Sequence, residues 1–472
     1  MFTKNTPMAP RAIFTGIYDF TRYLPILLLI SRPVFSEDWP QWLGTSRDGV
    51  WRETGILTSF PPQGPSVLWR VPIGGGYAGP TVSRGRVLIA DRFLTPGSKD
   101  SENLFQRSSS FGKERVLCLN ADNGTEIWKH SYDCAYNISY PCGPRISPTI
   151  HQDFVYTIGS MGDLKCLTLS EGKLQWSVNF VRDFGANVPV WGFACHPIII
   201  KDLLITLVGG KDPGSLVIAF NLKTGKVVWK SLQMERAQSE IGYSSPTLIE
   251  LNGIKQLIIW HPEGVASIDP ETGKKNWLVP FFLKANLSVA TPRLAGNSLL
   301  VSSFYNGSML LNIASDASGA GVTWQNKGRS ERPEQTDGLH SIMSTPFIHG
   351  DNFYGICSYG ELRCLDLKTG KRLWSDMRAT GSTSEPVERW ANAFIIKHED
   401  RYFLWNEKGD LIIAHLNPTG YHEVGRVHLL DPTGAAPGGG PVRKIIWSHP
   451  AFAMKSVFAR NDREVVRVSL AR

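Results

Sequence analysis

Two histidines occupy matching places in the sequence and could bring metal chemistry to one cavity. His196 and His449 each stand immediately before a proline, in the stretches CHPII and SHPAF. Imidazole nitrogens are frequent metal ligands, so two of them facing a shared channel could hold a metal ion. The same pair could instead line a polar channel or hydrogen-bond to its neighbours. We predict that they line the channel and hold no metal.

A charged and phenolic group precedes another proline of this kind. Glu235, Arg236 and Tyr243 lie shortly before Pro246. We predict that these three side chains rim the mouth of the same channel, where ligands of channel-containing folds often sit.

The stretch TDGLHS contains the residue types of a nucleophilic triad. Asp337, His340 and Ser341 fall within it. Catalytic triads are assembled in space and have no fixed sequence spacing, so this stretch is interpreted as an ordinary loop. No catalytic residue is predicted.

Seven cysteines are present in the chain. An odd number leaves at least one of them unpaired in an exported protein. Cys134 and Cys142, in the loop DCAYNISYPCG, are predicted to form a disulfide.

A repeated nine-residue pattern shows which elements must position these side chains. The pattern is D-x-x-T-G-K-x-x-W, and it is clearest in NLKTGKVVW and DLKTGKRLW. Copies recur about every fifty residues, which is typical of a repeat architecture. Asp or Asn followed by Thr-Gly-Lys predicts a tight hairpin, and the Trp on the outgoing strand needs cover from an adjacent repeat. The glycines and tryptophans at these structural positions are Gly124, Gly172, Gly225, Gly273, Gly370, Trp128, Trp176, Trp229, Trp277, Trp324 and Trp374. A decayed copy, LNPTGYHEV, has Gly420 at the fifth place and Val424 in place of Trp.

Each repeat also contains short apolar runs of strand type. Runs such as FVYTIG and QLIIWH are bounded by Gly, Asp or Asn, as strands are. A proline opens the first run of each repeat, except in the seventh, where Ala393 stands. Proline cannot donate to a β-ladder, so it belongs at the start of an edge strand. Each repeat is therefore predicted to be a four-stranded antiparallel blade of a propeller.

The two ends of the chain are predicted to close the ring together. Eight inner-strand elements occur, but the last repeat ends before its outer strand, while SVLWRV supplies an orphan Trp69 near the start. We predict an all-β fold: an eight-bladed β-propeller whose N- and C-terminal strands share the last blade. The predicted divisions are a signal peptide at 1–36, a lead-in segment at 37–65 and the propeller at 66–472.

Composition excludes some function classes. The formal charge of +8 comes from scattered residues. No basic run of the kind found in nucleic-acid or lipid-headgroup sites occurs, so no nucleic-acid partner is predicted. The insertion from Thr95 to Gly112 predicts a mobile surface loop in blade 1 that could contact a partner.

The N-terminus resembles a secretion signal. Basic residues precede a short apolar core, Leu24 to Ile30, and Val34 and Ser36 fit a small-residue cleavage site. The predicted location is periplasmic or extracellular. The alternative is an uncleaved anchor, which would be the only membrane attachment.

The nonamers and proline-marked strands resemble the repeats of the pyrroloquinoline-quinone (PQQ) propeller superfamily, which includes quinoprotein alcohol dehydrogenases and BamB-type outer-membrane assembly lipoproteins. The resemblance covers about residues 66 to 472 and implies an eight-bladed propeller. The dehydrogenases of this superfamily carry a vicinal cysteine pair, a calcium ion and an aspartate base. This chain has no adjacent cysteines and no CxxCH motif, and the calcium ligands have no matching positions. BamB-type proteins carry a lipidation cysteine, whereas the first cysteine here is Cys118.

These features favour an exported, non-catalytic propeller that binds a protein or another envelope macromolecule, without a cofactor. Two alternatives stay open. One is a diverged dehydrogenase that uses PQQ and calcium. The other is a carbohydrate-binding or carbohydrate-active propeller that uses exposed aromatics such as Trp191, Tyr305 and Trp390.

Overall fold

The computed structural model describes residues 37–236, 239–381, 388–436 and 442–472. Ser36–Arg472 forms one compact unit. The predicted signal peptide at 1–36 lies outside the described residues. Within the described ranges, no helix has the length and apolar character needed to span a bilayer.

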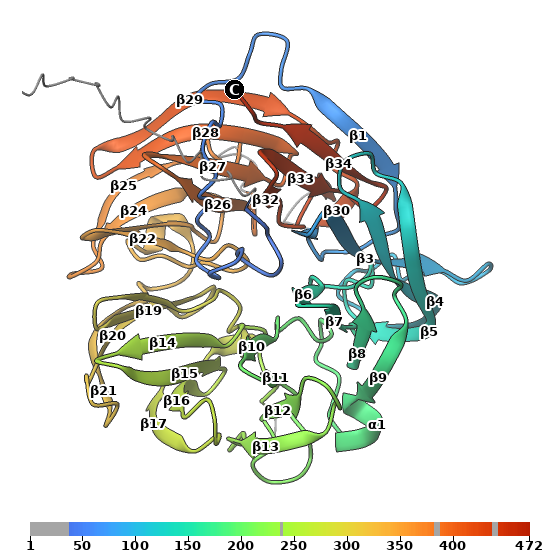
Figure 1. The fold of residues 1–472 in the computed structure, drawn as a ribbon. Helices are drawn as coiled ribbons and strands as arrows, with labels where there is room; N and C mark the ends of the chain where they lie inside the picture. Colours follow the sequence, from blue (N-terminus) through green and yellow to red (C-terminus); the bar gives the residue numbers. More distant parts are fainter. Residues whose placement is uncertain (1–36, 237–238, 382–387, 437–441) are drawn as a thin grey trace, which may run out of the picture. The chain divides into compact units, whose positions relative to one another are not determined.

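The described strands build eight four-stranded antiparallel sheets around a central axis, which confirms the predicted all-β, eight-bladed propeller (Figure 1). Blades 1 to 4 contain β2 (Thr81–Ser83), β3 (Arg86–Leu94), β4 (Ser108–Asn120), β5 (Glu126–Ile138); β6 (Thr149–His151), β7 (Phe154–Ile158), β8 (Asp163–Thr168), β9 (Leu174–Asn179); β10 (Ile198–Ile200), β11 (Leu203–Leu207), β12 (Val217–Asn221), β13 (Val227–Ser231); and β14 (Thr247–Leu251), β15 (Ile254–His261), β16 (Gly264–Ile268), β17 (Lys275–Pro280). Blades 5 to 7 contain β18 (Arg293–Ala295), β19 (Ser298–Ser303), β20 (Gly307–Ile313), β21 (Ala320–Asn326); β22 (Phe347–His349), β23 (Asn352–Ile356), β24 (Leu362–Asp366), β25 (Arg372–Asp376); and β26 (Ala393–His398), β27 (Arg401–Asn406), β28 (Asp410–Asn417), β29 (Gly420–His428). Blade 8 contains β32 (Ala451–Ala453), β33 (Ser456–Arg460), β34 (Glu464–Ser469) and β1 (Val67–Pro72).

Few other elements occur in the described residues. The strands β30 (Gly434–Ala436) and β31 (Arg443–Ile445) pair with each other outside the blades. The helical segments are α1 (Phe180–Phe184), η1 (Lys284–Asn286) and η2 (Pro333–Gln335).

The predicted ring closure is confirmed. β1 pairs antiparallel with β34, and Trp69 lies opposite Arg467 and Arg70 opposite Val466. β1 is therefore the outer strand of blade 8, although it lies near the start of the chain. This pairing covers the ladder edge of β34, an edge of the kind that promotes aggregation when it is exposed.

Tryptophan and glycine of the nonamers interlock neighbouring blades. Gly225 has a left-handed backbone (φ 68°), and a Cβ added there would lie 2.6 Å from the indole of Trp176 in the preceding blade. Most of the indole N–H groups also donate to a carbonyl in the next blade's turn: Trp69 to Ala121, Trp128 to Leu169, Trp176 to Leu222, Trp324 to Leu367 and Trp374 to Asn417. We predicted that an adjacent repeat covers each Trp. The part of that repeat that provides the cover is its nonamer turn. Trp277 differs, because it faces the stretched turn of blade 5 and donates instead to Gln256 of its own blade.

The seventh repeat departs from the predicted alignment. Its turn is one residue shorter, since Asn417 pairs directly with Gly420 and its Oδ1 accepts from Thr419 and Gly420. Glu423, and not Val424, then lies opposite the small residue Ala414, where other blades have Trp.

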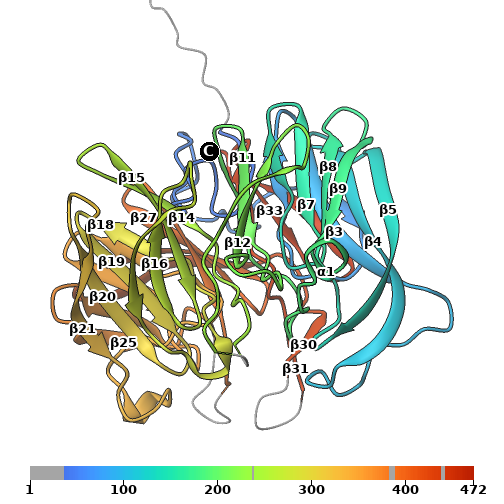
Figure 2. The ribbon, with the colours of Figure 1, turned by 90° about the horizontal axis from the view of Figure 1, so that it is seen from below.

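The lead-in segment closes one end of the central channel. Trp39 forms a bridge with Val82 of blade 1, and Trp51 donates to Lys397 of blade 7. Between them, Arg47 donates to the carbonyls of Pro197 and Pro246, in front of blades 3 and 4. Figure 2 shows this segment in dark blue at one end of the ring, with β30 and β31 at the other. One end of the channel is therefore sealed by the chain itself.

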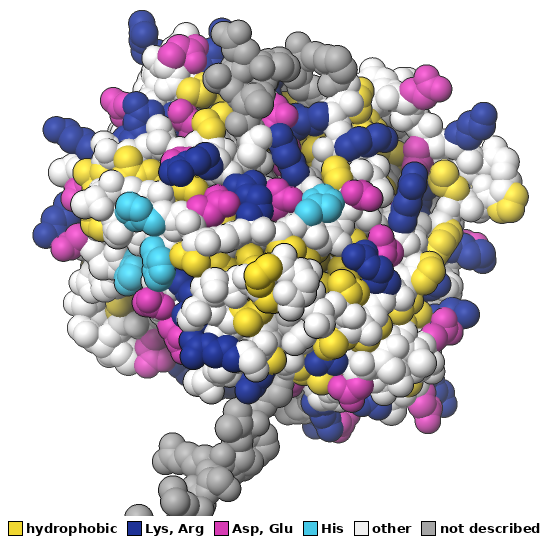
Figure 3. Space-filling model, turned by 90° about the horizontal axis from the view of Figure 1, so that it is seen from above, with side chains coloured by type: hydrophobic (Ala, Val, Ile, Leu, Met, Phe, Trp, Pro, Cys, Tyr) yellow, Lys and Arg dark blue, Asp and Glu magenta, His cyan; other side chains and the backbone are white. Residues whose placement is uncertain are grey.

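Charged side chains are mixed over the surface. On the face drawn in Figure 3, Lys and Arg are interspersed with Asp and Glu and form no continuous basic patch. This is the distribution of a solvated surface.

Candidate binding site at the channel mouth

The end of the channel opposite the lead-in segment opens into a pocket of about 380 Å³. Its polar lining residues are Arg145, His196, Ser245, Thr291 and His449. Aromatic side chains dominate the rest of the lining: Trp42, Tyr77, Phe105, Tyr140, Trp191, Tyr243, Tyr305, Trp390, Phe394 and Trp447. A concave, mostly apolar cavity with a few convergent polar groups is the usual form of a ligand site.

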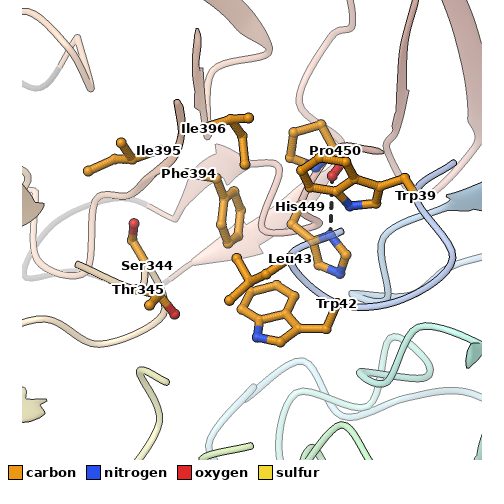
Figure 4. Close-up of a pocket in the computed structure, with 10 residues that line it drawn as sticks. All are labelled: Trp39, Trp42, Leu43, Ser344, Thr345, Phe394, Ile395, Ile396, His449 and Pro450. Carbon is orange, nitrogen blue, oxygen red and sulfur yellow. Dashed lines mark hydrogen bonds between the residues drawn. The ribbon is translucent and has the colours of Figure 1, made fainter. Parts of the chain in front are cut away.

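Trp42 of the lead-in segment forms the floor of this pocket. Its indole stacks on His196, with ring centroids 4.8 Å apart and planes 14° apart, and meets His449 edge-on at 4.5 Å. Its Nε1 donates to Thr291 Oγ1 at 3.0 Å. Figure 4 shows the rings of Trp42, Phe394 and His449 close together around a void of only about 10 Å³. The floor is therefore tightly packed.

The two predicted channel histidines converge, although their blades are not adjacent. Their ring centroids lie 5.9 Å apart. Ser147 Oγ lies 2.8 Å from Nε2 of His449, whereas the buried Nε2 of His196 has no hydrogen-bond partner among the described residues. No group of three or more metal-ligating side chains occurs in the described part of the chain.

Burial keeps both imidazoles neutral. It lowers the pKa of His449 to about 4. Burial also holds the pKa of His196 well below its usual value, and repulsion from the protonated form of His449 and from Arg47 lowers it further. Neutral imidazoles next to an indole make a floor that accepts or donates hydrogen bonds without carrying charge.

The walls consist of aromatic pairs from several blades. Trp191 and Tyr243 lie 5.5 Å apart on one side, and Tyr243 donates its hydroxyl to Glu240 at 2.8 Å. Tyr140 and Trp447 lie 5.9 Å apart on another side. Burial, reinforced by Glu240, raises the pKa of Tyr243 well above its usual value, so this hydroxyl stays protonated.

Two of these wall residues have unusual backbones. Tyr140 (φ 52°) and Trp390 (φ 65°) occupy the left-handed region, which costs a bulky residue about 1–2 kcal/mol. Backbone hydrogen bonds hold them there, since Tyr140 N donates to Leu104 O and Trp390 N to Ser358 O, each at 2.8 Å. Such strain is commonly found at functional sites.

The blade 1 insertion reaches across the mouth. Its residue Phe105 contacts Tyr140 at 5.5 Å and Trp390, which precedes blade 7, at 5.8 Å between ring centroids. Ser139 and Tyr140 both donate to backbone carbonyls of this insertion. Sequence reasoning placed the insertion on the surface but gave no sign that its tip joins the pocket.

Cations stack on aromatic rings along the rim. Arg236 lies 3.6 Å from the ring centroid of Phe282, and Lys284 lies 4.6 Å from that of Tyr305. Arg389 lies 4.9 Å from the Trp390 ring. Of the three residues predicted to rim the mouth, Tyr243 lines the pocket and Arg236 lies beside it on Phe282, which is 46% exposed. Glu235 does not line the pocket, and its backbone N–H donates to Glu263 Oε2.

The predicted disulfide is wrong for this structure, in which all seven cysteines are free. Cys134 is buried on β5, which continues as an extended strand to Ile138 and so carries the chain away from it. Cys142 lies beyond the strand end with its Sγ 3.2 Å from Asp462 Oδ1. The two sulfurs therefore have separate surroundings, Cys134 among buried side chains of β5 and Cys142 beside Asp462.

The TDGLHS stretch is structural, as interpreted. Asp337 pairs with Arg372 at 2.8 Å, and His340 is buried with its Nδ1 2.7 Å from Phe304 O. Ser341 Oγ donates to Ile356 O. The three side chains therefore have separate partners.

Comparisons with known proteins agree with this fold. The family model described as outer membrane protein assembly factor BamB matches residues 112–376. A curated protein of that name from Burkholderia pseudomallei (strain K96243) is 25% identical over 240 residues, which is 48% of this chain and 54% of that protein. The match thus spans about half the length of this curated relative.

Solved structures of low sequence identity share the architecture. BamB from Moraxella catarrhalis superimposes with a TM-score of 0.52 at 13% identity, covering 86% of this chain and 97% of that one. A europium-containing methanol dehydrogenase gives a TM-score of 0.59 at 11% identity, covering 92% of this chain and 89% of that one. At these identities the likeness shows the fold alone.

Proposed function

We propose that this chain, which belongs to the outer membrane protein assembly factor BamB family, is an exported, non-catalytic scaffold that binds a protein partner through the open face of its ring. The family name describes an assembly factor, so a protein partner is the expectation that membership supports. The predicted secretion signal supports export to the periplasm or beyond. An uncleaved N-terminal segment would be the only attachment to a membrane.

The rim of the channel mouth is the observation that carries the proposal. Lys284 on Tyr305 and Arg389 on Trp390 place cations over aromatic rings that line the pocket, and Arg236 stacks on Phe282 in the segment that leads to Lys284. Arginine and aromatic residues are enriched at the centres of protein interfaces. Phe282 is 46% exposed, and an interface anchor must be accessible in this way.

The pocket chemistry supports binding without a quinone cofactor. PQQ is a tricarboxylate that acts with calcium in the dehydrogenases, and calcium takes several oxygen ligands, mainly carboxylates. The described lining offers no aspartate or glutamate, and its single cationic side chain, Arg145, already donates to the carbonyls of Ser139, Tyr140 and Gly143. The residues of the pocket therefore do not fit PQQ with calcium, and we propose no redox step.

A comparison of surface variants in pull-down tests the scaffold. Tagged full-length protein would be cross-linked in envelope extracts, and R236A and F282A would be compared with wild type. We expect each substitution to reduce partner capture at least about fivefold, because each removes one half of the stacked Arg236–Phe282 pair. F93A is the matched control, since Phe93 is also 46% exposed, carries a stacked arginine, Arg115, and lies outside the pocket lining. Equal capture by F282A, R236A and F93A, or no partner in any extract, would refute the proposal.

A further inference from the structure

We propose that the aromatic pocket at the channel mouth binds a neutral saccharide, with a pyranose ring stacked on the aromatic walls and its hydroxyls meeting the polar floor. This inference goes beyond the protein scaffold proposed above and does not depend on it. The rim serves the protein partner, whereas the saccharide enters the cavity inside the rim.

The walls offer ring faces on more than one side. Trp191 with Tyr243 forms one platform, and Tyr140 with Trp447 forms another, at centroid distances of 5.5 and 5.9 Å. Trp390 with Phe105 adds a third. A pyranose has apolar C–H faces and polar edges, so it suits a cavity whose walls are aromatic and whose side chains end in O–H or N–H groups.

The floor offers hydroxyl groups to a ligand. Ser245 and Thr291 line the pocket. Thr291 Oγ1 accepts from Trp42 Nε1 and still has its own O–H to donate. Sugar hydroxyls both donate and accept, so they can pair with these groups.

The charges in the pocket argue against other occupants. A quaternary ammonium would use the aromatic rings but would meet the guanidinium of Arg145, which lies 5.1 Å from the Tyr77 ring centroid. A lipid chain would offer no acceptor to the hydroxyl groups of Ser245 and Thr291 in the lining. An anionic ligand would find Arg145 already committed to backbone carbonyls. A neutral, hydroxyl-rich ring is the class that meets both walls and floor.

Two wall residues are held in place at a conformational cost. Tyr140 and Trp390 adopt left-handed backbones, and each N–H is bonded to a distant carbonyl. The aromatic faces are therefore preset before any ligand arrives, which reduces the ordering cost of binding.

Titration calorimetry on the full-length protein tests the inference directly. The probes are glucose, N-acetylglucosamine, cellotetraose and chitotetraose. We expect a tetrasaccharide to bind with saturable heat in the micromolar to low millimolar range, as is ordinary for weak specific ligands. W191A and W390A should each weaken that affinity at least tenfold, whereas W191F, which keeps a ring face, should lose much less. F93A should bind as wild type does.

Folding and specificity are checked in the same samples. Thermal unfolding of each variant shows whether a loss of binding is a loss of fold, and W390A gives the result if W191A does not fold. PQQ with calcium is titrated in parallel. Absence of heat with every saccharide up to about 10 mM, or undiminished affinity in folded W191A or W390A, or preference for PQQ, would overturn the inference. Loss of protein-partner capture would not affect it, because calorimetry uses the purified chain alone.

Discussion

The buried histidines of the floor make stability depend on pH. His196 and His449 have pKa values lowered by burial, so the folded state keeps them neutral where the unfolded chain, with a His pKa of about 6.5, binds protons. Their contribution is complete above about pH 6.5 and is lost as the pH falls from there towards 4. We expect the free energy of unfolding to decrease by up to about 1.4 kcal/mol per pH unit for each histidine, measured by urea denaturation at about pH 7.5 and about pH 5.

Replacing one histidine separates this effect from general acid sensitivity. H449Q should remove part of the slope, because glutamine does not titrate. H422Q, at an exposed position, should keep the wild-type slope. A slope between those two pH values that is unchanged in H449Q would contradict the assignment.

The sequence predicted part of this site at the level of single residues. The phase of the proline-marked strands placed His196 and His449 towards the channel, and the structure has both in the pocket lining. Their stacking through Trp42 could not be predicted, because Trp42 belongs to the lead-in segment, which has no repeat phase. The unpaired His196 nitrogen likewise depends on packing between distant segments.

The blade-to-blade contact between tryptophan and glycine should control stability at the level of elements. A methyl group at Gly225 would lie 2.6 Å from Trp176, in addition to the cost of a left-handed alanine. We expect G225A to lower the free energy of unfolding by about 3 kcal/mol, measured by urea denaturation. G253A is the matched control, because Gly253 has a φ of 78° but nothing within 4 Å of an added Cβ. It should cost only the backbone term of about 1 kcal/mol, and equal losses in the two variants would show that the tryptophan contact is unimportant.

The elements were largely predictable because each repeat carries its own turn and strand signals. The predicted alignment was wrong only in the seventh repeat, because the blade that follows it has no nonamer turn. The outer strand of blade 8 is β1, so blade 8 offers no turn glycine against which a tryptophan on β29 could pack. Phe60 of the lead-in segment lies 3.5 Å from a Cβ added at Gly425 and packs there instead. Because no turn requires a tryptophan on β29, the residue type at this position is unconstrained, which explains the decayed repeat.

The lead-in segment should act as a structural seal of the whole ring. Trp42 is 7% exposed and donates to Thr291 across the channel. We expect W42A to lower the free energy of unfolding by about 3–5 kcal/mol, as for other large core truncations. It should also hydrate the floor, so that the pKa of His196 rises towards its ordinary value in an NMR titration. W42F, which keeps a ring against His196, should change both quantities less, and an unshifted His196 in folded W42A would show that other residues form the seal.

Closure of the ring by β1 is the feature on which the stability of the whole molecule should depend. β1 buries Trp69, which is 8% exposed, and covers the ladder edge of β34. A chain that begins at Gly74 loses that strand together with the lead-in segment, whereas a chain that begins at Glu37 keeps both. We expect the longer chain to unfold in a single transition by calorimetry and to stay monomeric in light scattering. The shorter chain should lose more than about 3 kcal/mol and associate through the exposed edge, because an unpaired strand recruits another strand. A chain that begins at Ser66 separates the two contributions, since it lacks the seal but retains β1. If the chains from Ser66 and Gly74 were equally stable and equally monomeric, the seal and not the shared blade would hold the ring together.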